Sequence, residues 1–187
     1  MPHVLSIQVG MPQEVVTETR QGPMTWTSSI FKTPVEGPVW LGALNLKGDG
    51  QADLTVHGGP DKAILAYSAD HYPFWREEFP DIDWQPGAFG ENFTIAGLTE
   101  DDVCIHDIYS IGEAIIQVSQ PRQPCWKLAT KLERPTLPKR VIKTGFSGWY
   151  FRVLQEGFVA AGQDLQLVER TIPDNTITAV NRYLYER

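Results

Sequence analysis

Short segments in which apolar and polar residues alternate recur along the chain, and Gly, Pro, Asp or Asn residues separate many of them. An alternation with a period of two places one face of a strand against a core, so each segment predicts a β-strand. The predicted strands cover residues 4–9, 14–19, 24–30, 39–46, 63–67, 92–95, 103–111, 114–118, 149–154 and 164–168. Many short strands with turn residues between them are typical of a β-barrel or a sandwich.

Four helices are expected among these strands. Ser68 is a suitable N-cap for a helix over 69–79, in which the aromatic side chains gather on one face and predict a core contact. A second helix should begin near Cys125 or Trp126, and a third should run over 136–144 and end at Gly145. A terminal helix is expected over 176–185. The predicted fold class is therefore mainly β with a few helices (α+β).

Length and composition predict one globular domain over 1–187, because a chain of this size buries a sufficient core without disulfides or a structural metal. The net charge of −7 argues against a broad nucleic-acid surface, which needs clustered Lys and Arg. The longest apolar stretches are far shorter than the roughly 20 residues of a membrane span, and no signal peptide is apparent. These features favour a cytoplasmic protein in which Cys104 and Cys125 stay reduced.

Cys125 ends a proline-rich segment, Ser-Gln-Pro-Arg-Gln-Pro-Cys at 119–125, that follows an apolar run. Each proline restricts its own backbone and that of the residue before it, so the thiol leaves a strand end on a stiff loop. The permanent cation of Arg122 would favour the reactive thiolate, and the positive end of a helix beginning at Cys125 would add to this effect. A buried, inert cysteine is the alternative, and from this segment the two interpretations are about equal.

Positive charge is concentrated just after Cys125. This basic run comprises Lys127, Lys131, Arg134, Lys139, Arg140 and Lys143. It would suit a small anion pocket, but a solvated helix face is the expected role of most of its members.

Two glycine-bearing loops are further candidates for a site. In the first, at 56–62, paired glycines precede Pro60 and Lys62, and such a turn can bind a phosphate or a pterin through its backbone N–H groups. In the second, at 87–92, Glu91 and Asn92 could hydrogen-bond the edge of a heterocycle. Ordinary tight turns explain either loop equally well when it is considered alone.

In combination, however, these segments closely resemble the MOSC domain, named for the C-terminal part of molybdenum-cofactor sulfurases, and within it the stand-alone bacterial YiiM type. The resemblance covers about 57–170. It rests on His-Gly-Gly-Pro-Asp-Lys-Ala at 57–63, His71-Tyr72, Phe-Gly-Glu-Asn-Phe at 89–93, Gly-Leu-Thr-Glu at 97–100, Gly112-Glu113-Ala114 and the segment 117–125. The chain stops at Arg187, without most of the helical C-terminal extension of longer members.

This resemblance implies a MOSC-type β-barrel with a cleft for the molybdenum cofactor, molybdopterin with its metal. Cys125 would be the catalytic residue and the metal ligand, because thiolate is a soft ligand suited to such a metal. The implied cofactor-binding residues are His57, Gly58, Gly59, Lys62, Phe89, Gly90, Glu91, Asn92, Gln120 and Arg122. Cys104 lies outside the matched motif and is expected to be a packed strand residue. Phe89, Trp126 and Trp149 could stack a purine, although core packing is the more common role of such residues.

YiiM-type proteins are associated with reductive detoxification of N-hydroxylated base analogues such as hydroxylaminopurines. The resemblance therefore implies a small-molecule N-hydroxylated substrate and an external electron-donor protein, since no flavin or nicotinamide fingerprint is visible. The net charge and the short apolar stretches predict no stable nucleic-acid binding and no membrane, and the sequence leaves the oligomeric state open. Two alternatives remain, namely a carrier or insertion module that holds the cofactor or a persulfide on Cys125, and a binding domain without cofactor.

Overall fold

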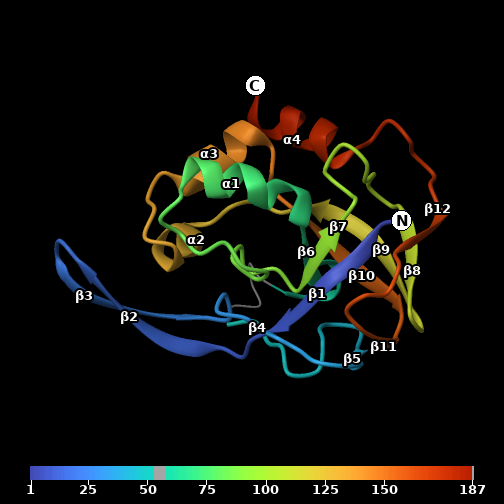
Figure 1. The fold of residues 1–187 in the computed structure, drawn as a ribbon, viewed down its shortest axis with the longest axis horizontal. Coiled ribbons are helices and arrows are strands. Elements are labelled where there is room, and N and C mark those ends of the chain that lie inside the picture. The colour runs from blue at the N-terminus through green and yellow to red at the C-terminus, as the bar shows by residue number, and fades with distance from the viewer. Residues whose placement is uncertain (53–57, 187) are drawn as a thin grey trace.

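The structure is a computed structural model, and it describes residues 1–52 and 58–186. Its main element is an eight-stranded sheet that curls into a half-barrel (Figure 1). Across this sheet the strands are β12 (Gln166–Glu169), β8 (Ile108–Ile111), β9 (Ala114–Pro121), β10 (Trp149–Gln155), β6 (Ile64–Ser68), β7 (Phe93–Ala96), β1 (His3–Val9) and β4 (Thr33–Pro34). Only β6 and β7 pair in parallel among the described strands. The mainly β fold class predicted from the alternating pattern is confirmed.

Two smaller sheets complete the strand structure. The first pairs β5 (Val39–Leu41) with β11 (Gly157–Val159), close to one end of the half-barrel. The second is a hairpin of β2 (Gln13–Thr19) and β3 (Gly22–Ser28), which projects from the rest of the molecule (Figure 1).

Burial along β9 explains why this segment is a strand. Ala114, Ile116 and Val118 are buried and their neighbours are more exposed, so one face of the strand joins the core, as the period of two predicts. Burial of an Ile or Val side chain contributes about 1.5–3 kcal/mol, which fixes this register. The same strand therefore delivers the segment after Pro121 to a defined place.

The helical segments differ in the core that they cover. They are η1 (Pro60–Lys62), η2 (Ala69–His71), α1 (Tyr72–Glu78), α2 (Trp126–Lys131), α3 (Leu137–Thr144) and α4 (Ile177–Tyr185). The helices α1, α2 and α3 supply residues of a second, aromatic core, whereas Ile177 of α4 packs into the main core of the sheet. In the aromatic core, the Trp75 and Trp84 rings stack at 5.8 Å and the Tyr67 and Phe89 rings at 4.0 Å. The aromatic face predicted for 69–79 is thus a core contact.

The predicted helix ends agree closely with the structure. The Ser68 hydroxyl accepts a hydrogen bond from the N–H of Asp70, although the first turn is a 3₁₀ helix rather than α-helical. Gly145 ends α3 with φ 76°, and the Thr176 hydroxyl caps α4 by accepting from the N–H of Ala179. Short polar side chains and glycine act here as the capping rules predict.

Two of the predicted strand ranges were too long, and a third, 24–30, is displaced from the observed strand Gly22–Ser28. In 103–111 the strand begins only at Ile108, because the Asp107 carboxylate accepts the N–H of Cys104 and closes a turn in which His106 has φ 71°. The strand predicted over 39–46 ends at Leu41, and the one predicted over 24–30 ends at Ser28. Side-chain-to-backbone hydrogen bonds compete with the sheet at such places.

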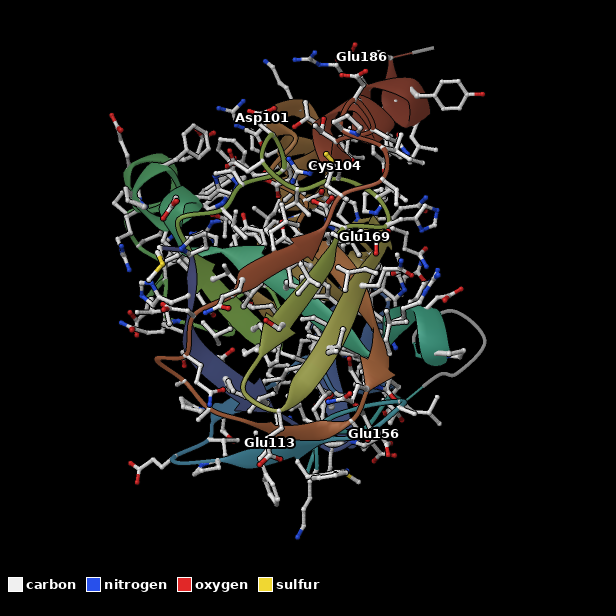
Figure 2. All side chains as sticks on the ribbon, turned by 90° about the vertical axis from the view of Figure 1, so that its right-hand side faces the viewer. Asp101, Cys104, Glu113, Glu156, Glu169 and Glu186 are labelled. Atoms are coloured by element: carbon white, nitrogen blue, oxygen red, sulfur yellow. The ribbon has the colours of Figure 1, made fainter. Side chains whose placement is uncertain are left out.

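Cys104 is fully buried and lies near the segment that enters α4 (Figure 2). Its thiol contacts the Pro173 carbonyl at 3.2 Å, which agrees with the expected packing role. Within the described residues, none of the helices is both long and apolar enough to cross a bilayer.

Candidate cofactor pocket

One pocket collects residues from seven separate segments of the chain. These segments are the end of β3 with the residues after it, the loop around Asp49, the residues from Gly58 to Lys62, β6 at Leu65, the loop 89–92, the connection from β9 to α2, and β10 at Tyr150. Seven of the predicted site residues are among its described lining residues, namely Gly58, Lys62, Phe89, Gly90, Asn92, Arg122 and Cys125.

Cys125 is held between a strand and a helix. β9 ends at Pro121, and the N–H of Arg122 then donates to the Gly148 carbonyl at 3.0 Å, which fixes the exit of the chain from the sheet. Cys125 is the extended N-cap residue of α2, as the sequence predicted, and its carbonyl accepts the N–H of Leu128. The residue is half-buried and lines the pocket, and it is not enclosed in the core as Cys104 is.

Arg122 carries a charge that the protein leaves poorly matched. The side chain is buried with 4% exposure, and Nη2 donates to the Phe89 carbonyl at 3.3 Å. Its Nη1 has no hydrogen-bond partner among the described residues. A buried guanidinium without full pairing is costly, so this atom indicates a place where an anionic or acceptor group would bind.

Positive charges outnumber negative ones in the pocket around Arg122. Four cationic side chains line the pocket, together with one described carboxylate, that of Asp49. The cations are Lys32, Lys62, Arg122 and Lys127. Lys32 pairs with Asp49 at 2.5 Å, and both side chains are almost completely buried. The hydroxyl of Ser29 is a second buried lining group without a hydrogen-bond partner within the described part of the chain. This chemistry suits an anionic, hydrogen-bonding ligand.

Tyr150 reaches the pocket from β10. Burial raises the pKa of its hydroxyl, the charge of Arg122 acts in the opposite direction, and Cys125 adds to the increase. The phenol therefore keeps its proton at neutral pH and can donate a hydrogen bond. The Lys62 ammonium lies 5.7 Å from the centre of the Tyr150 ring, within the range of a cation–π interaction.

Gly90 is required by the tight packing of the pocket wall. It has φ 78°, and a Cβ atom at this position would lie 2.6 Å from Cγ1 of Ile30. A residue with a side chain would therefore be strained and would also push Ile30, which itself lines the pocket.

The carboxylate of Glu91 accepts hydrogen bonds from its own loop and from two neighbouring elements. The oxygens accept hydrogen bonds from the Tyr72 hydroxyl, the Gly87 and Phe89 N–H groups and the Thr94 hydroxyl, at 2.6–3.0 Å. Glu91 is fully buried and is not among the described lining residues. The structure thus gives it the role of shaping the loop. Burial, followed by the charge of Glu91, raises the pKa of Tyr72 well above its usual range.

Asn92 also serves the architecture of the pocket. Its Oδ1 accepts the Leu65 N–H at 3.1 Å. Its Nδ2 donates to the Gln8 carbonyl at 3.2 Å and to the Asp49 carboxylate at 2.9 Å. The residue therefore joins β6, β1 and the Asp49 loop, and it holds the single described carboxylate of the lining in place.

The remaining predicted residues lie outside the described lining. Gln120 is in β9 opposite Tyr150, and Gly59 caps η1. Phe89 is a lining residue whose ring stacks in the aromatic core, and Trp149 is fully buried, so core packing explains both candidates for stacking a purine. His57 lies outside the described residues.

Several lining residues were not predicted as site residues: Ser28, Ser29, Lys32, Asp49, Lys127 and Tyr150 are examples. Lys127 was expected on a solvated helix face, but it lines the pocket and donates to the Thr27 carbonyl at 2.9 Å. Asp49 stood in a Gly-Asp-Gly turn, which gave the one usable signal, whereas the serines and Tyr150 lay in ordinary strand patterns.

Among the described residues, no group of three or more His, Cys, Asp or Glu side chains could hold a metal ion. A metal beside Cys125 would therefore need further ligands from a bound cofactor. The unpartnered Arg122 and Ser29 atoms and the excess of cations fit an anionic cofactor of this kind.

Comparison with known proteins places the chain in a family. The family model of the MOSC domain matches residues 53–166, which include the β6–β10 region and the Arg122–Cys125 segment. The chain belongs to the MOSC domain family.

The chain is similar to known proteins over almost its whole length. It is 47% identical over 182 residues to the uncharacterized protein YflK of Bacillus subtilis, covering 97% of the chain and 80% of that protein. It is also 39% identical over 165 residues to a protein named "Reductase" of Gibberella moniliformis, covering 86% of the chain but 29% of that protein. The crystal structure of YiiM from Geobacillus stearothermophilus superposes with a TM-score of 0.80 at 45% identity, covering 100% of the chain and 85% of that structure. The similarity to the family and to YiiM expected from the sequence motifs is thereby confirmed.

Proposed function

We propose that this MOSC protein is a molybdenum-cofactor-dependent oxidoreductase that reduces N-hydroxylated compounds, such as hydroxylaminopurine base analogues, to the corresponding amines. The observation that carries the proposal is the unpartnered, buried Nη1 of Arg122 in the pocket that Cys125 lines. A relative named "Reductase" and the similarity to YiiM support the same reaction class.

Each role in binding follows from the chemistry of the lining residues. Cys125 would hold the metal, because its half-buried sulfur opens onto the pocket and thiolate is a soft ligand. Arg122 would bind the anionic part of the cofactor and favour the thiolate of Cys125, and Lys62 would add positive charge. When bound, the molybdenum and its pterin would supply the two-electron redox chemistry.

The protein side of the reaction is proton supply. Reduction of an N-hydroxyl group to an amine consumes two electrons and two protons and releases water. Tyr150 lines the pocket as a protonated phenol, so it can hold a proton for the departing oxygen. The electrons would come from an external donor protein.

The test is elemental and pterin analysis of purified protein from a cofactor-competent host, combined with an artificial-donor assay on a panel of N-hydroxylated bases. The proposal expects stoichiometric molybdenum and pterin and reductase turnover, both of which are lost in Cys125→Ser. Cys104→Ser is the matched control, because Cys104 is enclosed in the core away from the pocket lining, and it should keep both. Turnover by Cys125→Ser at the parent rate would refute the proposal.

The accessibility of Cys125 favours one second candidate, a carrier that holds the cofactor or a persulfide for another enzyme. Mass spectrometry of freshly isolated protein separates the two. A persulfide on Cys125 without turnover supports the carrier, and an unmodified thiol with turnover excludes it.

A further inference from the structure

Lys131, the last residue of α2, is a basic side chain that the sequence placed on a solvated face. The structure corrects this expectation. Its Nζ donates to three backbone carbonyls, those of Gly87 at 2.7 Å, Ala88 at 3.0 Å and Ile30 at 3.1 Å. The three N–H bonds of an ammonium group are thereby all used, and no described ion pair includes Lys131.

The carbonyls that Lys131 binds belong to two walls of the pocket. Ile30 is a lining residue, and Gly87 and Ala88 directly precede the lining residues Phe89 and Gly90. Lys131 itself is on α2, the short helix that begins immediately after Cys125. One ammonium group therefore connects both walls to the helix that carries the candidate metal ligand.

We propose that Lys131 is a positioning residue that fixes both walls of the cofactor pocket relative to Cys125, and that loss of its proton sets the alkaline limit of ligand binding there. The inference rests on the proposed function for the identity of the ligand. The connection between the walls and α2 is independent of that identity.

The surroundings of Lys131 bring its pKa closer to neutral pH. Burial lowers the pKa of Lys131 to about 8, the Glu91 carboxylate opposes this change, and the charges of Arg122 and Lys32 add to it. The ring of Phe31 faces the ammonium at 5.9 Å. A neutral amine has two N–H donors for three carbonyls, so one of the three contacts is lost above this pH.

The effect on the pocket is separable from unfolding. Since the pKa of Lys131 is lower in the folded chain than the ordinary 10.5, the unfolded chain binds more protons between about pH 8 and 10.5. Over this window Lys131 therefore adds to the free energy of unfolding as the pH rises. The signature of the proposed role is a loss of ligand binding at alkaline pH with no greater decrease in melting temperature than in a variant whose charge persists.

The experiment compares the parent with Lys131→Arg, whose charge persists at all these pH values, and with Lys131→Gln, which has none. All three proteins also carry Cys104→Ser, so that Cys125 is the one cysteine left to be alkylated. Molybdenum and pterin retained after gel filtration, melting temperature, and the rate at which iodoacetamide alkylates Cys125 in the apoprotein are measured from pH 7 to 10.

The parent should lose roughly three- to tenfold in cofactor retention between pH 7 and 9.5, corresponding to one hydrogen bond. Lys131→Arg should show no such loss, and Lys131→Gln should already be low at pH 7. In the apoprotein, the alkylation rate of Lys131→Gln should differ by about threefold from that of the parent at pH 7, and the two should converge above pH 9.

Parallel pH profiles of the parent and Lys131→Arg would overturn the inference, as would parent-like retention in Lys131→Gln. Should Lys131→Gln fail to fold, the comparison of the parent with Lys131→Arg still decides. If no version retains cofactor, the proposed function fails, and the alkylation rates then decide on Lys131 alone. Equal rates of all three at every pH would overturn it.

Discussion

Two regions of this MOSC protein each contain a cysteine and an arginine, yet they differ in how the arginine is matched. Around Cys104, the Arg170 guanidinium donates to both oxygens of Asp107 at 2.9 and 2.6 Å, and Asp107 is fully buried. Around Cys125, Arg122 is buried with one carbonyl contact and an unpartnered nitrogen. The first region is internally complete, whereas the second is complete only when a ligand supplies the missing acceptor.

The two thiols differ in the same way. Burial raises the pKa of the Cys104 thiol, the charge of Asp107 raises it further, and Arg170 partly opposes both. Cys104 is therefore a protonated, packed group, while Cys125 opens onto a pocket lined by four cations. The residue type alone does not distinguish a structural cysteine from a functional one, but its electrostatic surroundings do.

The largest expected effect concerns the sulfur atoms. Cys125→Ser should lower N-hydroxyl reduction by more than about a hundredfold, since loss of a direct ligand exceeds the 10–100-fold cost of outer-shell changes. Cys104→Ser should stay close to the parent rate, because Cys104 is buried and is not among the described lining residues of the pocket. Steady-state rates with an artificial donor, together with molybdenum content, measure both. Equal losses in the two variants would remove the distinction between the regions.

Substitution of Arg122 should change the affinity for the cofactor, whereas substitution of Arg170 should change the stability of the fold. Arg122→Gln removes a charge-assisted contact to the ligand and should weaken cofactor binding by roughly 10–100-fold, while the apoprotein loses no melting temperature. Arg170→Gln should leave binding intact but lower the free energy of unfolding by about 3 kcal/mol, because Asp107 is left buried and unpaired.

Cofactor content after gel filtration and urea unfolding of both variants check this prediction. An Arg122→Gln apoprotein that is clearly less stable than the parent would show that Arg122 is structural, as Arg170 is.

Thiol reactivity should follow the same division. At pH 8, iodoacetamide should modify Cys125 at least about tenfold faster than Cys104, because the alkylating species is the thiolate and Cys104 is buried with a raised pKa. Peptide mass spectrometry after timed labelling gives both rates in one sample. Faster labelling of Cys104 would contradict the assignment of the two environments.

The smallest effect should appear in alkaline solution. Because the pKa of Cys104 is raised on folding, its contribution to stability is complete below the ordinary value of 9.0 and is lost as the pH rises through the folded value. Cys104→Ala should therefore show a shallower decline of melting temperature above pH 9 than the parent. The comparison of slopes matters here, since loss of the sulfur also changes packing at every pH.

Much of the fold could be read from local patterns. The strand alternation in 114–118, the cap at Ser68, the terminal helix and the end of the third helix at Gly145 all depend on neighbours in sequence, and all appear in the structure. Local rules were less successful where a side chain hydrogen-bonds the backbone. Asp107 does so by accepting the N–H of Cys104 in the turn before β8.

For the pocket, the motifs assigned Lys62, Arg122 and Cys125 to one site, and each is among the lining residues of one pocket. They did not separate Glu91 from this group, because its four donors come from three segments that meet only in the folded chain. Lys131 was assigned to solvent for a similar reason, as its acceptors lie more than 40 residues away.

The sequence by itself determined the strand-rich fold class, the helix ends, the family and the stiff loop that carries Cys125, because these depend on local backbone preferences and ordered motifs. The tertiary structure alone decided which charges are matched. Folding brings the Asp107 carboxylate to Arg170, which is thereby fully matched. It brings one carbonyl to Arg122, whose Nη1 stays without a hydrogen-bond partner among the described residues. Desolvation and pairing depend on distances between remote segments, and those distances exist only after folding.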